Sequence, residues 1–215
     1  MIELTLIIII SYLIGSSPTS LILGKVFKNI DIRDHGSRNA GMTNVYRVMG
    51  WKPAAIVGIV DITKGWFAAA IIPNYIESSI IDVFAITQIV AGFSAVMGHT
   101  FSVFSGFHGG KGVATLGGML IALYPIALPI CLSIFIISLI LTGYVSVGSM
   151  SASISLALVV LLLPNFGFDK PAESLKIFSL LIPLFVIFTH RSNIGRLIRR
   201  EENRFEKMMV FRRKK

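Results

Sequence analysis

Residues 4–24 read LTLIIIISYLIGSSPTSLILG, an apolar run long enough to decide the class of fold. A helix needs roughly 20 apolar residues to cross the hydrocarbon core of a bilayer. No basic residue precedes the run and no small-residue cleavage site follows it, so we expect a retained span rather than a removed signal. Only Gly15-Ser16-Ser17-Pro18 interrupts the run, which predicts a kink there.

The composition of the whole chain is that of a membrane protein. Of its 215 residues, 54% are hydrophobic and only 14% are charged, whereas about a quarter of the residues in soluble domains are charged. A core built from a chain of this length cannot bury so much aliphatic surface, so lipid must cover much of it. The composition therefore excludes an ordinary soluble globular domain.

Further apolar segments predict an all-α polytopic membrane protein. They lie at 53–73, 83–104, 113–124, 127–146, 150–164 and 175–189. The stretch 113–146 is too long for one span and short for two, and we expect Tyr124-Pro125 and Pro129 to break it. Two crossings there give seven transmembrane helices, and a re-entrant hairpin gives five. No repeat or linker divides the chain, so we expect one integral-membrane domain over residues 1–215.

Loop charge predicts the orientation in the membrane. Six of the 20 Lys and Arg residues lie in 25–52 and ten lie in 190–215, whereas 74–82 contains two acidic residues and no basic one. By the positive-inside rule, the two basic segments are cytoplasmic, and the N-terminus and 74–82 lie outside. Either count of crossings also puts the loop around Lys111 inside. We interpret the tail 190–215 as an anchor on anionic lipid and expect no binding of nucleic acid.

Three polar blocks are thereby predicted to share the cytoplasmic face. Block one is GSRNAGMTNVYR at residues 36–47, block two combines Gly98-His99 with GGKGVAT at 109–115, and block three is HRSN at 190–193. Glycine, hydroxyl, amide, histidine and basic side chains together can bind phosphate and move a proton. We expect the blocks to converge into one pocket with room for two anions, in an enzyme that joins a soluble phosphate to a lipid.

The candidate ligands of block one offer hydrogen-bond donors or a backbone that can approach a ligand closely: Gly36, Ser37, Asn39, Gly41, Thr43, Asn44 and Arg47. Arg47 can bind a phosphate through two parallel hydrogen bonds. Ser, Thr and Asn also favour turns and helix caps, so a purely structural loop is the alternative.

Block two places Gly109, Gly110 and Gly112 around Lys111 at the start of an apolar segment. Backbone N–H groups at a helix start form a nest for an anion, and Lys111 adds a positive charge. A nucleotide-binding P-loop is not predicted, because Gly112 stands where that motif needs Ser or Thr. The alternative is a flexible loop whose lysine extends toward the bilayer surface.

In block three, His190 ends the last apolar segment and Asn193 follows it by three residues, which is one turn of a helix. Histidine titrates near neutrality, so His190 is a candidate base or hydrogen-bond donor. The alternative is an interfacial histidine that only ends a span.

Asp61 and Lys64 lie inside the segment 53–73 and share a helix face, as a structural pair or as the floor of a site. His99 either lines the site or forms a hydrogen bond across helices. Cys131 has no partner for a disulfide, and the four histidines have no acidic partner at ligand spacing, so we expect neither a metal site nor a cofactor.

The three blocks, in this order and spacing, resemble the signatures of the bacterial acyl-phosphate-dependent glycerol-3-phosphate acyltransferases, the PlsY family. The resemblance covers essentially the whole chain and also includes Asp61 and Lys64-Gly65. It implies seven transmembrane helices in the bacterial inner membrane, with the active site facing the cytoplasm. The implied reaction moves a fatty acyl group from acyl phosphate to the 1-hydroxyl of glycerol 3-phosphate and gives lysophosphatidate and phosphate, with neither acyl-CoA nor acyl carrier protein as donor.

The resemblance also implies roles for residues at matching positions. Glycerol 3-phosphate would be bound by Ser37, Arg47, Lys111, His190 and Asn193. Acyl phosphate would be held by Asn39, Thr43 and the glycines of block two. The hydroxyl proton would pass either to His190 or to a phosphate oxygen of the donor.

Three positions depart from the family pattern. Arg38 and Arg200 stand where the family usually has glycine, and Ser102 stands where it has proline. We expect Arg38 to affect the local backbone and to leave the chemistry in place.

Three other functions are compatible with parts of the sequence. A small anion transporter would also use glycine breaks and intramembrane charges, but it would need its polar groups near the midplane. An acyltransferase with a thioester donor would use His99 as a deep histidine. A regulatory membrane anchor would act through the basic tail.

Overall fold

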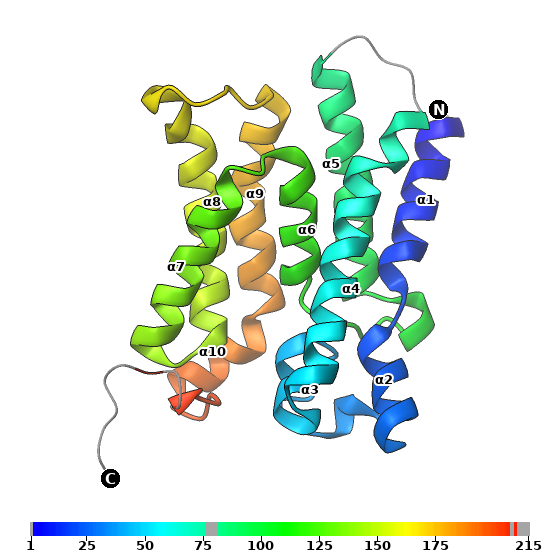
Figure 1. Cartoon of the computed structure of the whole chain (residues 1–215), viewed down its shortest axis with the longest axis vertical. Coiled ribbons are helices and arrows are strands. Elements are labelled where there is room, and N and C mark those ends of the chain that lie inside the picture. Colours follow the sequence, from blue (N-terminus) through cyan, green and yellow to red (C-terminus); the bar gives the residue numbers. More distant parts are fainter. Residues whose placement is uncertain (1, 76–80, 207–208, 210–215) are drawn as a thin grey trace. The chain divides into compact units, whose positions relative to one another are not determined.

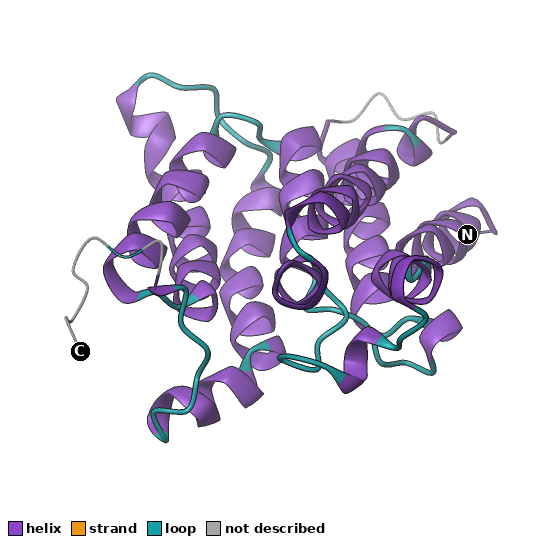
Figure 2. Cartoon of the chain, turned by 60° about the horizontal axis from the view of Figure 1, so that its bottom comes forward, coloured by secondary structure: helices purple, strands orange, loops and turns teal. Residues whose placement is uncertain are grey.

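The computed structural model describes residues 2–75, 81–206 and 209, and every regular element within them is a helix (Figures 1 and 2). This confirms the predicted all-α class. The chain forms two compact units, Met1–Pro125 (unit 1) and Ile126–Lys215 (unit 2), which are described separately. The expectation of a single domain stays a prediction. Part of the linker 74–82 and most of the tail beyond residue 206 lie outside the described residues.

The helices of unit 1 are α1 (Ile2–Ser16), α2 (Thr19–Lys28), α3 (Met42–Met49), α4 (Trp51–Ala70), α5 (Ile81–Thr100) and α6 (Val113–Leu123). Short 3-10 turns lie at Ile32–Asp34, Ile72–Tyr75 and Val103–Ser105. The predicted kink is confirmed, because α1 ends and α2 begins on either side of Ser17 and Pro18. In Figure 1, α2 and α3 lie at one end of unit 1, and the start of α1 and the end of α4 lie at the other.

The helices of unit 2 are α7 (Ala127–Thr142), α8 (Val145–Leu162), α9 (Glu173–Thr189) and α10 (Arg191–Ile198), with a 3-10 turn at Leu163–Phe166. In this unit α8 packs against both α7 and α9.

The predicted break at Tyr124-Pro125 is confirmed, because α6 ends at Leu123. The predicted break at Pro129 is wrong, because this proline lies in the first turn of α7, where its missing N–H would have no partner within the helix. The segment expected at 150–164 begins earlier, at Val145, because Gly143 with a φ of 77° ends α7.

Four helical stretches among the described residues are long and apolar enough to cross a membrane, or five if the bent pair α9 and α10 counts as one. The four are Ile2–Lys28, Trp51–Tyr75, Val83–Ser105 and Val145–Phe166. Two apolar helices are shorter, since α6 has 11 residues and α7 has 16. The number of crossings, seven or five, and the side on which each end of the chain lies stay predictions.

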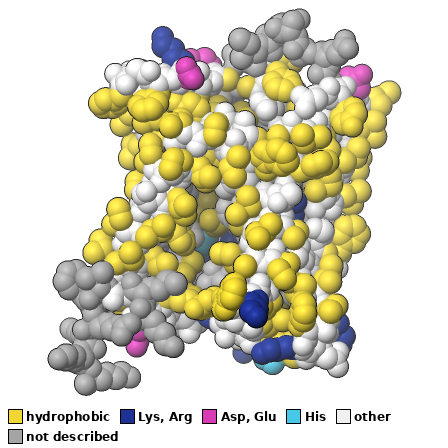
Figure 3. Space-filling model, in the orientation of Figure 1, with side chains coloured by type: hydrophobic (Ala, Val, Ile, Leu, Met, Phe, Trp, Pro, Cys, Tyr) yellow, Lys and Arg dark blue, Asp and Glu magenta, His cyan; other side chains and the backbone are white. Residues whose placement is uncertain are grey.

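The surface of unit 1 separates apolar from basic side chains. Figure 3 shows hydrophobic side chains over the flank of this unit and Lys and Arg side chains gathered at its lower end, where α2 and α3 lie. The exposed basic residues of this region are Lys25, Lys28, Arg38 and Lys52. This separation suits a helical unit whose flank contacts lipid and whose basic end contacts anionic headgroups.

Two glycines allow α1 and α5 to pack backbone against backbone. A Cβ atom on Gly15 would overlap the carbonyl oxygen of Ala95 on α5. A Cβ atom on Gly98 would in turn overlap the carbonyl oxygen of Tyr12 on α1. Small residues permit such close approach in membranes, where lipid removes the hydrophobic drive for helix association.

The pair α4 and α6 is built in the same way. A Cβ atom on Gly65 of α4 would overlap the carbonyl oxygen of Thr115, and one on Gly118 of α6 would overlap that of Ile62. The residue beside Gly118 is different, because a Cβ atom on Gly117 would meet no atom within 4 Å. Contact between these two helices therefore depends on particular glycines.

We predict that Gly118→Ala lowers the thermal midpoint of the detergent-solubilised protein, because the added methyl group must push α6 away from α4. Overpacking of this kind costs about 1–3 kcal/mol. The control is Gly117→Ala on the same helix, which should be neutral or slightly stabilising because alanine favours helix more than glycine does. Equal midpoints for the two variants would contradict the proposed close packing.

Candidate active site

Block one is folded around a buried amide, the side chain of Asn44 on α3. Its Oδ1 accepts a hydrogen bond from the backbone N–H of Ser37 at 2.7 Å. Its Nδ2 donates to the carbonyl oxygens of Ile32 and His35, both at 2.9 Å. The side chain is completely buried, and both amide hydrogens have acceptors within the protein. Asn44 therefore holds the loop in shape, and its predicted contact with substrate stays a prediction.

The loop of block one turns at Gly36 and Arg38, which both have a φ of 60°. A Cβ atom on Gly36 would overlap Oδ1 of Asn44, so glycine is required there. Arg38 stands where the resemblance expects glycine, and it nevertheless adopts the left-handed conformation. Its N–H donates to the carbonyl oxygen of His35 at 3.0 Å. The side chain of Arg38 therefore leaves the left-handed turn in place.

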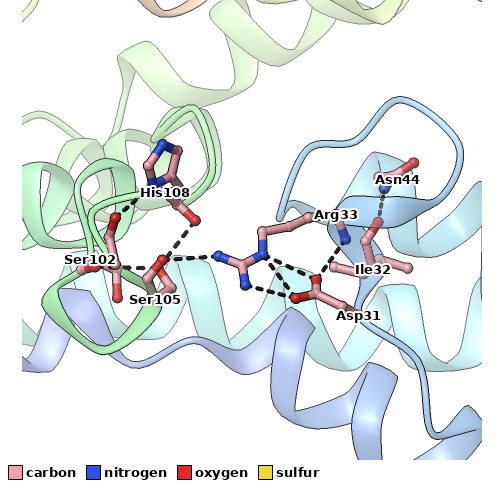
Figure 4. Close-up of polar contacts among 8 residues, drawn as sticks. Asp31, Ile32, Arg33, Asn44, Ser102, Ser105 and His108 are labelled. Atoms are coloured by element: carbon pink, nitrogen blue, oxygen red, sulfur yellow. Dashed lines mark hydrogen bonds and ion pairs between the residues drawn. The ribbon is translucent and has the colours of Figure 1, made fainter.

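Arg33 lies in the turn just before block one and contacts the loop that carries block two (Figure 4). Its Nη1 donates to the carbonyl oxygen of Ser105 at 2.9 Å, while its Nε and Nη2 bind the carboxylate of Asp31 at 3.1 and 2.7 Å. The hydrogen bond from Arg33 lowers the pKa of Asp31, against the opposing effect of partial burial. The same bond raises the pKa of Arg33. The two loops are thus joined by a side chain that stays charged at neutral pH.

The loop between α5 and α6, residues 101–112, folds back onto the end of α5. The N–H groups of Gly109 and Gly110 donate to the carbonyl oxygens of Thr100 and His99, both at 3.0 Å. A Cβ atom on Gly109 would overlap the carbonyl oxygen of His99, and one on Gly110 would overlap its Nε2. Both positions therefore require glycine because the end of α5 lies against them.

Lys111 lies two residues before α6, at the start of the apolar segment as the sequence predicts. Gly112 has a φ of 79° and caps α6, and its carbonyl oxygen accepts the first hydrogen bond of the helix from Leu116 at 2.8 Å. The first N–H groups of a helix lack partners within the helix, and they favour an anion. Lys111 is half-buried and precedes these N–H groups by two residues in the chain.

Ser102 stands where the resemblance expects proline, and its φ of −66° is one that proline also adopts. The serine hydroxyl donates to the carbonyl oxygen of Ser16 at 2.5 Å, at the break between α1 and α2. This buried hydrogen bond ties the loop after α5 to that break, which a proline ring cannot do.

A cluster of charged and titratable side chains lies buried between α4 and α5. Nζ of Lys64 is 2.8 Å from Oδ1 of Asp61, and Nδ1 of His99 is 3.4 Å from the same oxygen. Lys64 also donates to the carbonyl oxygen of Ser17 at 3.3 Å. The cluster lines a small pocket in unit 1, together with Ala40, Ser102 and the glycine pair of block two. Asp61 and Lys64 are thus a paired couple, and His99 both contacts another helix and faces the pocket.

In unit 2, a buried glutamate organises the end of block three. Glu202 accepts hydrogen bonds from Nδ2 of Asn193 at 2.6 Å, Nε of Arg196 at 2.7 Å and the hydroxyl of Ser146 at 3.3 Å. Arg200, the third departure from the family pattern, has a φ of 60° in the turn just before this glutamate. Glu202 therefore joins α10 to the start of α8.

The ring of His190 is oriented by the helix that it ends. Its Nδ1 lies 2.8 Å from the carbonyl oxygen of Val186, which can only accept, so Nδ1 carries the proton in this contact. In the neutral ring, Nε2 then carries the lone pair. The side chain is buried. The structure therefore fixes which nitrogen of His190 is suited to accept a proton.

The predicted site residues divide between the two units. Block one and block two lie in unit 1, near each other at one end, and contain Ser37, Asn39, Gly41, Thr43, Asn44, Arg47, Gly109, Gly110, Lys111 and Gly112. His190 and Asn193 lie in unit 2. The binding roles of these residues and the convergence of block three with the other two stay predictions. Among the described residues, no group of three or more His, Cys, Asp or Glu side chains is placed to hold a metal ion.

A comparison with protein families identifies the family of this chain. Residues 5–200 match the family model described as glycerol-3-phosphate acyltransferase. The chain belongs to the glycerol-3-phosphate acyltransferase family.

Relatives and solved structures extend this result over the whole acyltransferase chain. It is 41% identical to the glycerol-3-phosphate acyltransferases of Chlorobium chlorochromatii and Chlorobium limicola, covering 95% of this chain and 97% of each relative. The fold resembles the crystal structure of PlsY, an integral membrane glycerol 3-phosphate acyltransferase, in its glycerol 3-phosphate form. That match has a TM-score of 0.79 at 32% identity over 94% of this chain and 95% of that one. The lysophosphatidic acid form of PlsY matches with a TM-score of 0.77. The acyltransferase is therefore an integral membrane protein.

Sequence reasoning missed the polar contacts that shape the loops of this acyltransferase. It assigned no role to Asp31 and Arg33, and it did not foresee the contacts that Glu202 makes. The one available signal for the first pair was an acidic and a basic residue two positions apart, in a loop beside block one. For Glu202, the signal was an acidic residue nine positions after Asn193, in a tail rich in basic residues.

We predict that the Asp31–Arg33 contact stabilises this acyltransferase above about pH 4 and no longer does so in more acidic solution. The folded-state pKa of Asp31 lies below its ordinary value, so the stabilisation is complete above the unfolded pKa and is lost as pH falls through the folded pKa. The measurement is the thermal midpoint of wild type and Asp31→Asn across pH 3–8. The gap between them should be constant at neutral pH and should close in acid.

The control for this prediction is Asp34→Asn, which removes an exposed carboxylate from the same turn. Its midpoint should follow that of wild type closely, because exposed charges contribute little to stability. A gap between wild type and Asp31→Asn that widens below pH 4 would refute the assignment.

Proposed function

We propose that this membrane acyltransferase moves a fatty acyl group from acyl phosphate to the 1-hydroxyl of glycerol 3-phosphate, in the biosynthesis of phospholipids. The products are lysophosphatidate and inorganic phosphate. Family membership supports the acceptor, as do the glycerol 3-phosphate and lysophosphatidic acid forms of the PlsY structure. The observation in this chain that carries the proposal is the Arg33–Ser105 bond, which joins two loops rich in phosphate-binding residues at one end of unit 1.

The proposed roles follow from the charges that the reaction requires. Both substrates carry phosphate, so Arg47 and Lys111 serve as cationic anchors. The N–H groups of Gly109 and Gly110 already donate to the end of α5, so the backbone donors for phosphate are those at Gly112 and the start of α6. Ser37 and Asn193 bind glycerol 3-phosphate, and the acyl phosphate is held by Asn39, Gly41 and Thr43, while Asn44 shapes the loop from inside. The positioning of Ser37 by the buried amide of Asn44 supports this division, because it leaves the Ser37 hydroxyl for substrate.

The chemistry is a direct transfer that needs no covalent enzyme intermediate. The 1-hydroxyl oxygen attacks the carbonyl carbon of acyl phosphate, the bond from that carbon to the phosphate oxygen breaks, and phosphate leaves with the bonding electrons. The protein positions the two substrates and stabilises charge on the leaving phosphate. The hydroxyl proton passes to Nε2 of His190, whose orientation is set by Val186, or to a phosphate oxygen of the donor.

We place the active site on the cytoplasmic side of a bacterial inner membrane, with the N-terminus outside. The support is the distribution of basic residues between loops and the gathering of exposed Lys and Arg at the end of unit 1 that carries blocks one and two. Glycerol 3-phosphate is soluble and the acyl donor is a lipid, so a site at the membrane surface serves both.

We predict that the purified protein forms lysophosphatidate from acyl phosphate and labelled glycerol 3-phosphate, because the donor is already activated and its phosphate matches the cationic loops. Acyl-CoA and acyl carrier protein, offered as alternative donors in the same detergent assay, should give no product. Product from a thioester donor alone would reject the proposed donor.

Matched substitutions in the same assay distinguish the loss of a cation in the active site from the loss of any positive charge on the protein. Arg47→Ala and Lys111→Ala should reduce the rate by more than about 100-fold, since each removes a charge that stabilises the transition state. The control Lys52→Ala removes an exposed lysine near the same end of unit 1 and should retain the rate. For His190→Ala, a loss above about 100-fold assigns the proton transfer to this histidine, and a smaller loss assigns it to the donor phosphate.

We predict that all three polar blocks face the cytoplasm. Single cysteines are introduced in a Cys131→Ser background at Arg38, His108 and Ser192, with Tyr75 as the marker for the opposite face. These four side chains are exposed. A membrane-impermeant maleimide should label the first three only in inside-out vesicles and the fourth only in intact spheroplasts. Labelling of any block from the outside would contradict the single cytoplasmic site.

A further inference from the structure

The buried cluster of unit 1 consists of three ionisable side chains, Asp61, Lys64 and His99. The reaction proposed above gives this cluster no role. Asp61, Lys64 and His99 are 3%, 5% and 8% exposed. A carboxylate at this depth needs partners, and Asp61 has two, Lys64 at 2.8 Å and His99 at 3.4 Å. Lys64 alone would neutralise its charge, so charge balance does not explain why a histidine from a second helix shares the same oxygen.

The contacts of the opposite ring edge, which carries Nε2, explain why a histidine is used here. Nε2 lies 2.1 Å from the position that a Cβ atom of Gly110 would take, and ring carbons Cε1 and Cδ2 are 2.9 and 3.1 Å from it. The backbone of His99 holds the same turn, because its carbonyl oxygen accepts the N–H of Gly110 at 3.0 Å. The ring therefore lies between the carboxylate of Asp61 on one side and the glycine turn on the other.

The glycine turn leads directly into the groups that the proposed function uses. Lys111 is the next residue after Gly110, and α6 begins two residues later, at Val113. A change in the tilt of the His99 ring is therefore passed to the backbone immediately before Lys111. Because Asp61 holds Nδ1, the ring cannot rotate away from the turn without breaking that contact.

We propose that Asp61 and His99 are positioning residues, which set the shape of the Gly109–Gly110 turn and thereby the placement of Lys111 for phosphate. Asp61 orients the ring, Lys64 pairs with Asp61 and holds it in place, and the ring supports the turn. The inference rests on the proposed function, since it concerns the phosphate site of that reaction. Neither Asp61 nor His99 needs to touch a substrate in this role.

The first test uses two replacements that each keep one edge of the ring. His99→Asn retains a side-chain amide in place of Nδ1, so Asp61 keeps a donor while Gly110 loses its support. We expect its thermal midpoint to stay near that of wild type. The KM of at least one phosphate-bearing substrate should rise about tenfold, with a smaller change in kcat, because a displaced anchor weakens binding.

The complementary variant is His99→Gln, whose amide reaches toward the place of Nε2 but no longer donates from the position of Nδ1. We expect a lower thermal midpoint and KM values closer to those of wild type. A purely structural histidine would make KM follow stability in both variants. If the two substrates keep their wild-type KM in His99→Asn, the positioning role is wrong.

The second test is a double-mutant cycle with a control built into the turn. Gly110→Ala places a methyl group against the His99 ring, so combining it with His99→Asn should recover activity at least about threefold over Gly110→Ala alone. Gly109→Ala places its methyl group against the carbonyl oxygen of His99, which no side-chain change removes, so His99→Asn should not rescue it. Equal coupling at both glycines, or none at Gly110, overturns the proposal.

The proposed function can fail separately from this inference. Wild type that makes lysophosphatidate only from a thioester donor rejects acyl phosphate as the donor, and the same variants are then compared through the KM for glycerol 3-phosphate with that thioester. If wild type uses acyl phosphate but the effects of Gly110→Ala and His99→Asn are additive, only the positioning role is rejected.

Discussion

The carboxylate of Asp61 lies in the middle of a helix whose outer face is apolar, where an unpaired charge would be costly. Its partners come from three places in the chain: Lys64 one turn further along α4, His99 at the end of α5, and, through Lys64, the carbonyl oxygen of Ser17 at the break between α1 and α2. The need to satisfy one carboxylate therefore brings together the points at which α1 and α5 stop being helical. The loops that carry candidate site residues extend from the helix ends at this end of unit 1. Their position therefore follows from the need to pair the buried carboxylate of Asp61.

Close packing of the helices has to match that requirement. The reciprocal glycines of α4 and α6 bring their backbones into contact, and this fixes α6 against the helix that carries Asp61. Since Lys111 and Gly112 directly precede α6, the start of α6 is placed by packing, and the turn before it is placed by contact with His99. The candidate phosphate loop is thus held from two sides by interactions that involve none of its own charged groups.

The sequence predicted the helices well because apolar length and proline or glycine breaks are local signals. The breaks at Ser17-Pro18 and Tyr124-Pro125 are confirmed. Pro129 misled because its effect depends on its position within the helix, and a proline in the first turn does no harm. The residue types in the loops could be interpreted from the sequence, but their hydrogen-bond partners could not. Asn44 is a residue type that often binds ligands, yet its amide faces inward. One partner of Arg33 lies 72 residues away along the chain, and one partner of Glu202 lies 56 residues away. No local pattern encodes such long-range contacts.

Arginine stands at two positions where the resemblance predicts glycine. Both positions show how strongly these hydrogen bonds determine the backbone conformation. Arg38 and Arg200 both keep a φ of 60°, a conformation that costs a residue with a side chain about 1 kcal/mol. Such strain persists only where the surroundings leave the chain no alternative. In each case a buried polar side chain close by makes three hydrogen bonds: Asn44 holds the loop around Arg38, and Glu202 holds the turn after Arg200. The left-handed turns at these two arginines therefore follow from a backbone shape that the buried amide and carboxylate impose, and that shape does not require glycine at either position.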